Sequence, residues 1–269
     1  MELLKQKIYF SLIQADLVWE NTQANLDKFD KLLSEIPDET EMVILPEMFS
    51  TGFTMNVDNL EKPLGKKAFE WMRDKAKELQ KIIVGSILTE DQGKYYNRMF
   101  WMRPDATYDY YDKRHLFHQG GEDKVMTAGE KKTIVTYKGV RFLLQICYDL
   151  RFPVWSKNNY DPKTGQYDYD AIIYIANWPE IRKQAYLNLT KARAIENQAF
   201  VFWVNRLGND AKNIYHSGDT QIVDAYGNTM ASAVSRKENI LFVSIDFSFV
   251  NNLRENFNVG LDWDKFKIL

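Results

Sequence analysis

Short apolar runs alternate with segments of helical periodicity along the chain, and this alternation restricts the folds that the chain can adopt. Apolar positions three and four residues apart predict helices, whereas short continuous apolar runs between turn residues predict buried strands. Helices are expected over 21–33, 63–80 and 180–198, and strands over 7–14, 42–45, 82–88, 171–176, 200–205, 219–224, 229–233 and 240–246. Hairpins are expected from strands over 95–103 and 107–112, and over 131–137 and 140–147. This pattern predicts an α/β fold with a mixed sheet, or with two sheets packed together.

Composition and charge exclude several classes of protein. The chain has 269 residues without a repeat or a flexible linker, so we expect one domain over residues 1–269. Its 35 Lys and Arg residues nearly balance 37 Asp and Glu residues, which argues against nucleic acid as a partner. No apolar run reaches the roughly 18 residues that cross a bilayer, so no membrane partner is expected. Residues 1–7 are too short and too charged for the core of a signal peptide.

The only cysteine, Cys147, closes an apolar strand and precedes a segment, 148–155, that is expected to turn into a short helix. A thiol at such a turn faces free N–H groups and the positive end of a helix, which favour the thiolate. The N–H of Tyr148 could donate to an oxyanion in the same turn. The alternative is that Cys147 is a small buried hydrophobic residue, as free cysteines commonly are. A single cysteine forms no disulfide within the chain, which indicates a reducing cytoplasm.

Two charged residues also directly follow predicted strands. Glu47 comes after the apolar run 42–45 and Pro46, where burial would make a carboxylate a better proton acceptor. Lys113 comes after the strand over 107–112. Because open α/β sheets bind ligands beyond the carboxyl ends of their strands, Glu47, Lys113 and Cys147 could meet in one site. The alternatives are a solvated loop residue or helix cap for Glu47, and a solvated surface lysine for Lys113.

Other catalytic schemes find little support in the sequence. The histidines are His115, His118 and His216, and none stands in a recognisable cysteine protease context. The chain has no Gly-x-Ser-x-Gly turn, no Walker loop and no Gly-x-Gly-x-x-Gly loop. His115 and His118 lie three residues apart without further metal-type ligands, so no metal site is expected. Both are expected in a loop or at the rim of a pocket.

Three blocks of sequence resemble the nitrilase, or carbon–nitrogen hydrolase, superfamily. They are Leu-Pro-Glu-Met-Phe-Ser-Thr-Gly-Phe at 45–53, Tyr-Asp-Lys-Arg-His-Leu-Phe at 111–117 and Cys-Tyr-Asp-Leu-Arg-Phe-Pro at 147–153. The resemblance covers nearly the whole chain and is closest to the ω-amidase branch, which hydrolyses the terminal amide of α-ketoglutaramate and α-ketosuccinamate. It implies a four-layer αββα sandwich, in which two mixed sheets face each other and helices lie outside.

The resemblance also implies roles for the reactive side chains. Glu47 would be the general base, Lys113 the stabiliser of the tetrahedral oxyanion, and Cys147 the nucleophile that forms a thioester. These roles are consistent with the residue types, because an amide is a poor electrophile and a free thiol is mostly protonated at neutral pH. A metal or an organic cofactor is not needed for this chemistry, so none is expected.

The family carries a second glutamate in the loop between the lysine and cysteine blocks. Its position matches Glu122, and Asp123 and Glu130 are the alternatives. This loop has no strong motif of its own, so the sequence leaves the three acids open.

An ω-amidase must also bind a carboxylate and a keto group on its small-molecule substrate. The candidates for substrate contact are Phe53, His115, Tyr148, Arg151 and Trp178. Arg151 could pair with the substrate carboxylate, or it could form a salt bridge with Asp149 or Glu196. The aromatic candidates could instead contribute only to packing.

Other functions and the oligomeric state stay open at this point. The same side chains could hydrolyse a nitrile, a carbamoyl amine or deaminated glutathione. A non-catalytic scaffold or a redox sensor is less favoured, because base, cation and thiol are all present and no resolving thiol exists. The resemblance suggests a homodimer, with Phe257, Leu261, Trp263 and Phe266 of 251–269 available for an interface. The alternative is that these side chains pack on their own domain.

Overall fold

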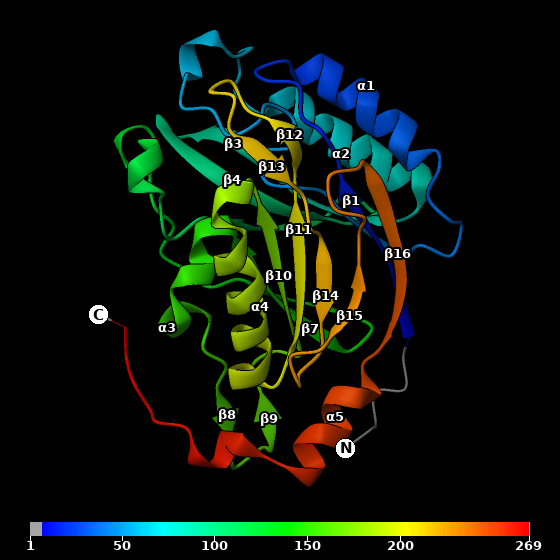
Figure 1. Ribbon diagram of the computed structural model, residues 1–269, viewed down its shortest axis with the longest axis vertical. Helices are drawn as coiled ribbons and strands as arrows, with labels where there is room; N and C mark the ends of the chain where they lie inside the picture. Colours follow the sequence, from blue (N-terminus) through cyan, green and yellow to red (C-terminus); the bar gives the residue numbers. More distant parts are fainter. Residues whose placement is uncertain (1–6, 269) are drawn as a thin grey trace.

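Two mixed β-sheets form the centre of the computed structural model, which describes residues 7–268 (Figure 1). The first sheet has the strand order β16-β1-β2-β3-β4-β5. Its parallel centre consists of β1 (Lys7–Gln14), β2 (Met42–Ile44) and β3 (Ile82–Asp91). Antiparallel pairing adds β16 (Asn239–Asp246), β4 (Lys94–Met102) and β5 (Tyr108–Asp112). Two antiparallel pairings in succession make β5 run in the same direction as β2.

The second sheet has the strand order β15-β14-β11-β10-β7-β6. Its parallel strands are β7 (Val140–Ile146), β10 (Ala171–Ala176) and β11 (Phe200–Asn205). Its antiparallel strands are β6 (Ile134–Tyr137), β14 (Gln221–Val223) and β15 (Thr229–Ser232). Every residue of β10 and β11 is buried, because this part of the sheet is covered on both faces.

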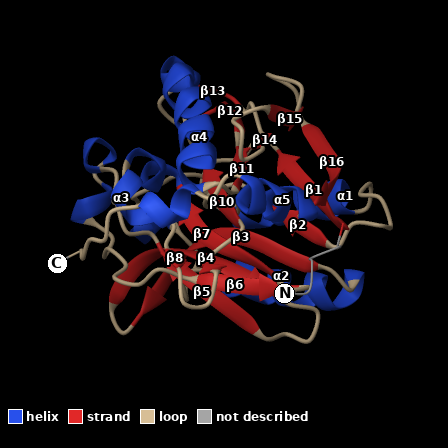
Figure 2. Cartoon of the chain, turned by 90° about the horizontal axis from the view of Figure 1, so that it is seen from below, coloured by secondary structure: helices blue, strands red, loops and turns tan. Residues whose placement is uncertain are grey.

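Helices cover the outer faces of the sheets, which gives four layers (Figure 2). α1 (Thr22–Leu33) and α2 (Lys66–Leu79) pack on the first sheet, and α4 (Lys183–Asn197) packs on the second. The inner faces meet through aromatic rings: centroids are 4.6 Å apart for Phe10 of β1 and Phe202 of β11, and 5.4 Å apart for Trp101 of β4 and Phe142 of β7. This arrangement confirms the expected α/β fold with two mixed sheets between outer helices.

Several elements are shorter than expected, at their start or at their end, because the backbone there becomes left-handed. The helix expected over 63–80 begins at Lys66, after Gly65 with a φ of +76°. The helix expected over 180–198 opens with a 3₁₀ turn, η5 (Glu180–Arg182), and ends before Gln198, which has a φ of +46°. The strand expected over 219–224 narrows to β14, and Asp219 ahead of it has a φ of +59°. Such positive φ values are incompatible with a regular helix or strand.

Short elements that the periodicity did not predict complete the fold. They are the hairpins β8–β9 (Tyr160–Asp161, Gln166–Tyr167) and β12–β13 (Leu207–Asn209, Tyr215–Ser217) and the helix α5 (Ser248–Asn256). Strands of two or three residues are too short to show an alternating pattern. The short helix expected after Cys147 is present as a 3₁₀ turn, η4 (Cys147–Arg151), followed by α3 (Pro153–Ser156).

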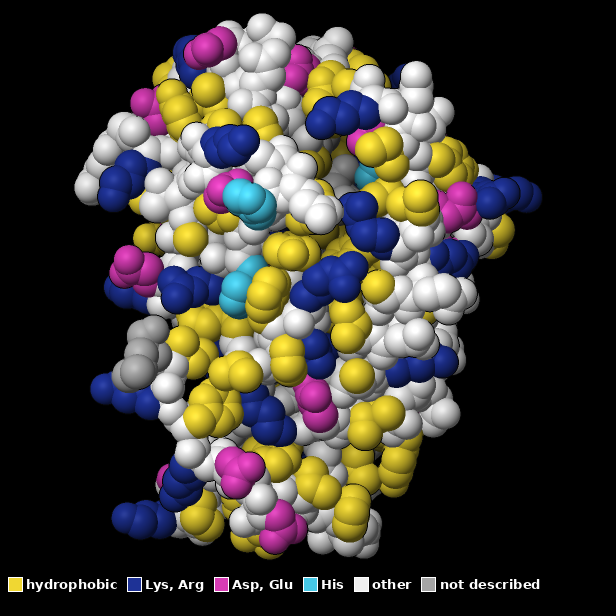
Figure 3. All heavy atoms as spheres, turned by 60° about the vertical axis from the view of Figure 1, so that its left-hand side comes forward, with side chains coloured by type: hydrophobic (Ala, Val, Ile, Leu, Met, Phe, Trp, Pro, Cys, Tyr) yellow, Lys and Arg dark blue, Asp and Glu magenta, His cyan; other side chains and the backbone are white. Residues whose placement is uncertain are grey.

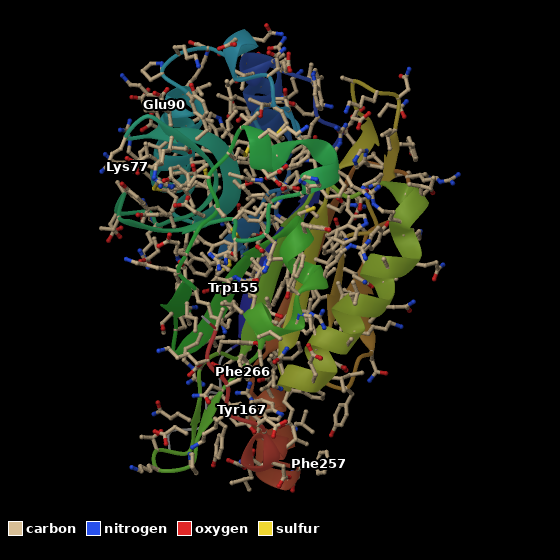
Figure 4. All side chains as sticks on the ribbon, turned by 90° about the vertical axis from the view of Figure 1, so that its left-hand side faces the viewer. Lys77, Glu90, Trp155, Tyr167, Phe257 and Phe266 are labelled. Atoms are coloured by element: carbon tan, nitrogen blue, oxygen red, sulfur yellow. The ribbon has the colours of Figure 1, made fainter. Side chains whose placement is uncertain are left out.

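The aromatic residues near the C-terminus divide between packing and exposure. The Trp263 ring packs edge-on against Tyr167, with centroids 5.6 Å apart, so it does pack on its own domain. Phe257, Leu261 and Phe266 are 66%, 65% and 52% exposed. In Figure 4, Tyr167, Phe257 and Phe266 lie toward the lower end of the molecule. A partly apolar surface is therefore present at that end.

Candidate active site

The charged side chains that follow strand ends meet between the two sheets. Glu47 follows β2 and Lys113 follows β5 in the first sheet, whereas Cys147 follows β7 in the second. Lys113 Nζ lies 2.9 Å from Glu47 Oε1 and 2.8 Å from Glu122 Oε2. These three side chains are completely shielded from solvent. Cys147 is 8% exposed and lies close enough to Glu47 and Lys113 for both charges to shift its pKa.

Lys113 is held in its charged form by the carboxylates around it. Burial lowers the pKa of a lysine, but the negative charges of Glu122 and Glu47 outweigh burial here and raise the pKa of Lys113 above its ordinary value. The main chain fixes the residue as well, because its N–H donates to Asn97 O at 3.0 Å and its carbonyl accepts from Gly129 N at 2.9 Å. The site therefore contains a permanent buried cation.

Glu122 is the loop acid that contacts this cation. It begins a 3₁₀ turn, η3 (Glu122–Lys124), and its Oε2 accepts a hydrogen bond from Phe117 N at 2.6 Å. Burial raises the pKa of Glu122, the Lys113 ammonium opposes this shift, and Glu47 adds to it. The two alternatives lie elsewhere: Asp123 pairs with the exposed His118, and Glu130 is exposed.

Cys147 occupies a strained turn at the end of β7. Its φ of +45° lies in the left-handed region, which is costly for a residue with a side chain and is typical of functional turns. Burial and the Glu47 carboxylate raise the pKa of the thiol well above its usual value, although the Lys113 ammonium and the N–H of Asn177 lower it. The expectation that this turn favours the thiolate was wrong, because the loss of hydration outweighs the N–H groups of a five-residue 3₁₀ turn.

Two asparagines complete the cluster, and the sequence analysis missed both. Asn97 Nδ2 donates to Glu47 Oε1 at 2.8 Å and to Glu122 Oε1 at 3.2 Å. Asn177 donates its backbone N–H to Glu47 Oε2 at 2.7 Å and its side-chain Nδ2 to Glu47 O at 2.6 Å. Asn177 directly follows β10, so the strand-end rule could have identified it, whereas Asn97 lies within β4 and carries no such signal.

A cavity of about 820 Å³ opens above the thiol. Its lining includes four of the five predicted contact residues, Phe53, Tyr148, Arg151 and Trp178, together with Lys113 and Cys147. The lining also includes Arg182 and His216, which the sequence analysis did not assign to the pocket. The size is within the range of about 300–1,000 Å³ that small-molecule sites usually have.

His115 does not line this cavity, contrary to the prediction. Its Nδ1 lies 2.8 Å from Asp149 Oδ1, and its ring stacks on Phe152 with centroids 3.8 Å apart. Asp149 is buried and also accepts from the Tyr111 hydroxyl at 2.8 Å. The ring is thus held by a buried acid outside the cavity, and no local pattern in the sequence indicates this contact.

Arg151 is available to the cavity because its possible acidic partners are occupied. Asp149 bonds to Tyr111 and His115, and Glu196 pairs with Arg193 at 2.9 Å. The Arg151 guanidinium instead lies over the Trp178 ring, 4.8 Å from its centroid.

Within residues 7–268, no three His, Cys, Asp or Glu side chains are grouped so that they could hold a metal ion. No helix of the described chain has the length and apolar content to span a membrane.

Comparisons with known proteins show the family to which this chain belongs. A family model named Carbon-nitrogen hydrolase matches residues 10–255. The chain is 39% identical to omega-amidase YafV of Yersinia enterocolitica, over 96% of this chain and 98% of the relative. It is 29% identical to the 2-oxoglutaramate amidase of Bacillus subtilis, over 93% and 95% of the two chains. A crystal structure of a CN-hydrolase superfamily protein from Xanthomonas campestris, with an arsenic adduct in its active site, superposes with a TM-score of 0.93 at 35% identity, covering 98% of this chain and 99% of the other.

The four-layer fold and the buried acid–lysine–thiol cluster define an enzyme that hydrolyses carbon–nitrogen bonds other than peptide bonds. The chain belongs to the carbon–nitrogen hydrolase family of the nitrilase superfamily.

Proposed function

We propose that this protein is an ω-amidase, which hydrolyses the terminal amide of α-ketoglutaramate or α-ketosuccinamate to the keto acid and ammonia. The names of its relatives, omega-amidase YafV and 2-oxoglutaramate amidase, support this substrate class. The observation that carries the chemistry is the buried lysine between two carboxylates, next to a thiol at the floor of the cavity.

In the first half of the proposed reaction, Cys147 Sγ attacks the amide carbon while Glu47 takes the thiol proton. Because burial keeps the thiol protonated, this base is needed at neutral pH. The Lys113 ammonium and the Tyr148 N–H stabilise the oxyanion, and donors of this kind are typically worth about 10²–10³ in rate. Glu47 then gives the proton to the leaving nitrogen, the C–N bond breaks, and ammonia and a thioester are formed.

In the second half, Glu47 takes a proton from water as the water oxygen attacks the thioester carbon. The C–S bond breaks, sulfur regains the proton, and the keto acid leaves. Glu122 and Asn97 hold the Lys113 ammonium and the Glu47 carboxylate in place during both halves.

Replacement of the thiol tests this mechanism. Cys147→Ala and Cys147→Ser are expected to reduce ammonia release from α-ketoglutaramate by at least about 10³-fold, because the nucleophile is lost. Ammonia would be measured for both variants and for the original protein, with circular dichroism to show that the fold is retained. A nitrile and a carbamoyl amine serve as comparison substrates. Turnover retained in a folded Cys147→Ala protein would refute the thioester route, and a clear preference for a comparison substrate would refute the substrate class.

We further propose that the enzyme works as a homodimer in a reducing cytoplasm. A single cysteine with no disulfide partner in the chain is typical of proteins from a reducing compartment. The exposed Phe257 and Leu261 support an interface at the end of the molecule where α5 lies. Figure 3 shows apolar side chains exposed over the lower part of one face. Sedimentation of the original protein is expected to show a dimer, and the double variant Phe257→Ser/Leu261→Ser is expected to dissociate more readily. An original protein that is monomeric at micromolar concentration would contradict this proposal.

A further inference from the structure

Two guanidinium groups line the cavity, and neither has an acidic partner in the part of the chain that the structure describes. Arg151 ends η4, the turn that begins with Cys147, and Arg182 ends η5, which follows β10 and Asn177. Among residues 7–268, neither of them forms an ion pair, whereas the other arginines except Arg114 each pair with a carboxylate. Arg114 donates to Gly129 O at 3.1 Å instead.

Each of the two guanidinium groups lies beside an aromatic wall of the cavity. The Arg151 guanidinium carbon is 4.8 Å from the centroid of the Trp178 ring, and that of Arg182 is 5.2 Å from the Phe117 ring. Trp178 and Phe117 both line the cavity. Contact with a ring restricts a planar guanidinium and leaves its N–H edge available for a ligand.

The Arg182 guanidinium lies close enough to Cys147 and to Arg151 for both groups to shift its pKa. Burial lowers the pKa of Arg182, a negative charge at Cys147 opposes this, and Arg151 lowers it further. The two positive charges repel each other, so an anion that contacts both guanidinium groups would stabilise them.

The acids that line the same cavity are engaged elsewhere. Glu20 accepts hydrogen bonds from Thr54 and from Asn59, the latter at 3.2 Å. Asp210 accepts from the backbone N–H groups of Lys212 at 2.8 Å and Ile214 at 2.9 Å. Asp210 stabilises its own loop, and Glu20 joins the segment after β1 to residues 54–59, so neither carboxylate pairs with Arg151 or Arg182 within the described chain.

We propose that Arg182 is a specificity-determining residue that, together with Arg151, binds the carboxylate of the substrate. The substrate class is then an amide whose acyl chain ends in a carboxylate away from the reacting carbon. This inference rests on the proposed ω-amidase activity and adds Arg182 to it. A carboxylate held by two guanidinium groups also positions the amide carbon at Cys147.

The test compares Arg182→Gln and Arg151→Gln with the original enzyme on a charged and a neutral substrate. With α-ketoglutaramate, each variant is expected to raise KM by about 10- to 100-fold with a smaller effect on kcat, because one charge-assisted interaction is lost. With pentanamide, which lacks the carboxylate, kcat/KM is expected to stay within about 2-fold. Arg182→Lys keeps the charge and should recover part of the affinity for α-ketoglutaramate. Arg73→Gln, on the exposed face of α2, is the matched control and should behave like the original enzyme.

A second readout does not depend on turnover. The product α-ketoglutarate is expected to protect Cys147 from alkylation by iodoacetamide, and Arg182→Gln should need about 10-fold more product for the same protection. An unchanged KM and unchanged protection in Arg182→Gln would overturn the role of Arg182 while the proposed function stands. Equal losses on α-ketoglutaramate and pentanamide would also overturn it, since they indicate a structural effect. An original enzyme that hydrolyses pentanamide but no keto acid amide would instead refute the proposed function.

Discussion

A buried lysine between two carboxylates is stable only as a complete group. Lys113, Glu47 and Glu122 are shielded from water, so each charge depends on the other two and on the N–H groups around them. Removing one partner of a buried ion pair usually costs about 3–5 kcal/mol, because a charge is left uncompensated. Of the three loop acids that the sequence left open, Glu122 is the one that accepts hydrogen bonds from Lys113.

Glu122→Gln is therefore expected to lower kcat for amide hydrolysis by about 10²-fold or more. The amide of Gln can still accept a hydrogen bond from Lys113, but it no longer balances the ammonium charge. Asp123→Asn and Glu130→Gln are the matched controls in the same loop and should retain kcat within about 2-fold. Steady-state kinetics on all three variants would measure this, and an equal loss in Asp123→Asn would contradict the assignment of Glu122.

At the scale of elements, the β12–β13 hairpin carries a neutral histidine toward the cavity. His216 in β13 is buried, and its Nδ1 lies 3.0 Å from Ile214 O and 3.2 Å from Gly208 O. Burial, assisted by the positive charge of Arg206, lowers the pKa of His216 to about 4. The neutral His216 ring can donate a hydrogen bond from Nδ1 to one of these backbone carbonyls, which helps to hold the hairpin. The ring loses its hydration in this buried position, which is why its neutral form is favoured.

This pKa predicts a specific pH dependence of stability. The unfolded chain binds a proton at His216 near pH 6.5 and the folded chain only near pH 4, so the unfolded state binds more protons between these values. The contribution of His216 to the free energy of unfolding is complete above about pH 6.5 and falls by about 2–3 kcal/mol as the pH approaches 4. Urea unfolding at pH 4.5 and pH 7 would measure the change.

His216→Gln should reduce this dependence, because the replacement does not titrate. His118→Gln is the control, because the His118 side chain is 80% exposed, and this variant should keep the same change in the free energy of unfolding with pH as the original protein. Identical pH dependence in His216→Gln and the original protein would show that the histidine is not the titrating group.

At the scale of the whole molecule, the site exists because the two sheets pack face to face. The aromatic layer between them includes Phe10, Trp101, Phe142 and Phe202, all of them buried. Glu47 and Lys113 follow strands of the first sheet, and Cys147 follows a strand of the second. The distance between acid and thiol is therefore set by the packing of this layer.

Phe142→Ala is expected to lower the free energy of unfolding by about 3–5 kcal/mol, because it opens a cavity in the layer between the sheets. Ile181→Ala, which shortens a side chain that is 84% exposed, should change it by less than about 0.5 kcal/mol. Urea unfolding monitored by circular dichroism measures both variants. Similar values for the two would mean that the layer between the sheets does not hold the fold together.

The sequence predicted those parts of the molecule whose signal is local. The helix expected over 21–33 is present as α1, and the structure adds that the Asn21 side chain accepts a hydrogen bond from Ala24 N at 3.0 Å at its start. The apolar runs that became β10 and β11 are fully buried strands, as expected. The order of chemical groups along the chain also placed a base, a cation and a thiol at strand ends.

Only the tertiary structure decided how those groups act on one another. The orientation of His115 depends on Asp149, 34 residues away, and the position of Glu47 depends on the N–H of Asn177, 130 residues away. The raised pKa of Cys147 arises from burial and from neighbours on other elements, and Arg182 lies over the Phe117 ring with no carboxylate partner among the residues that the structure describes. Residue type and spacing are properties of the chain, whereas desolvation and charge pairing exist only after distant segments have come into contact.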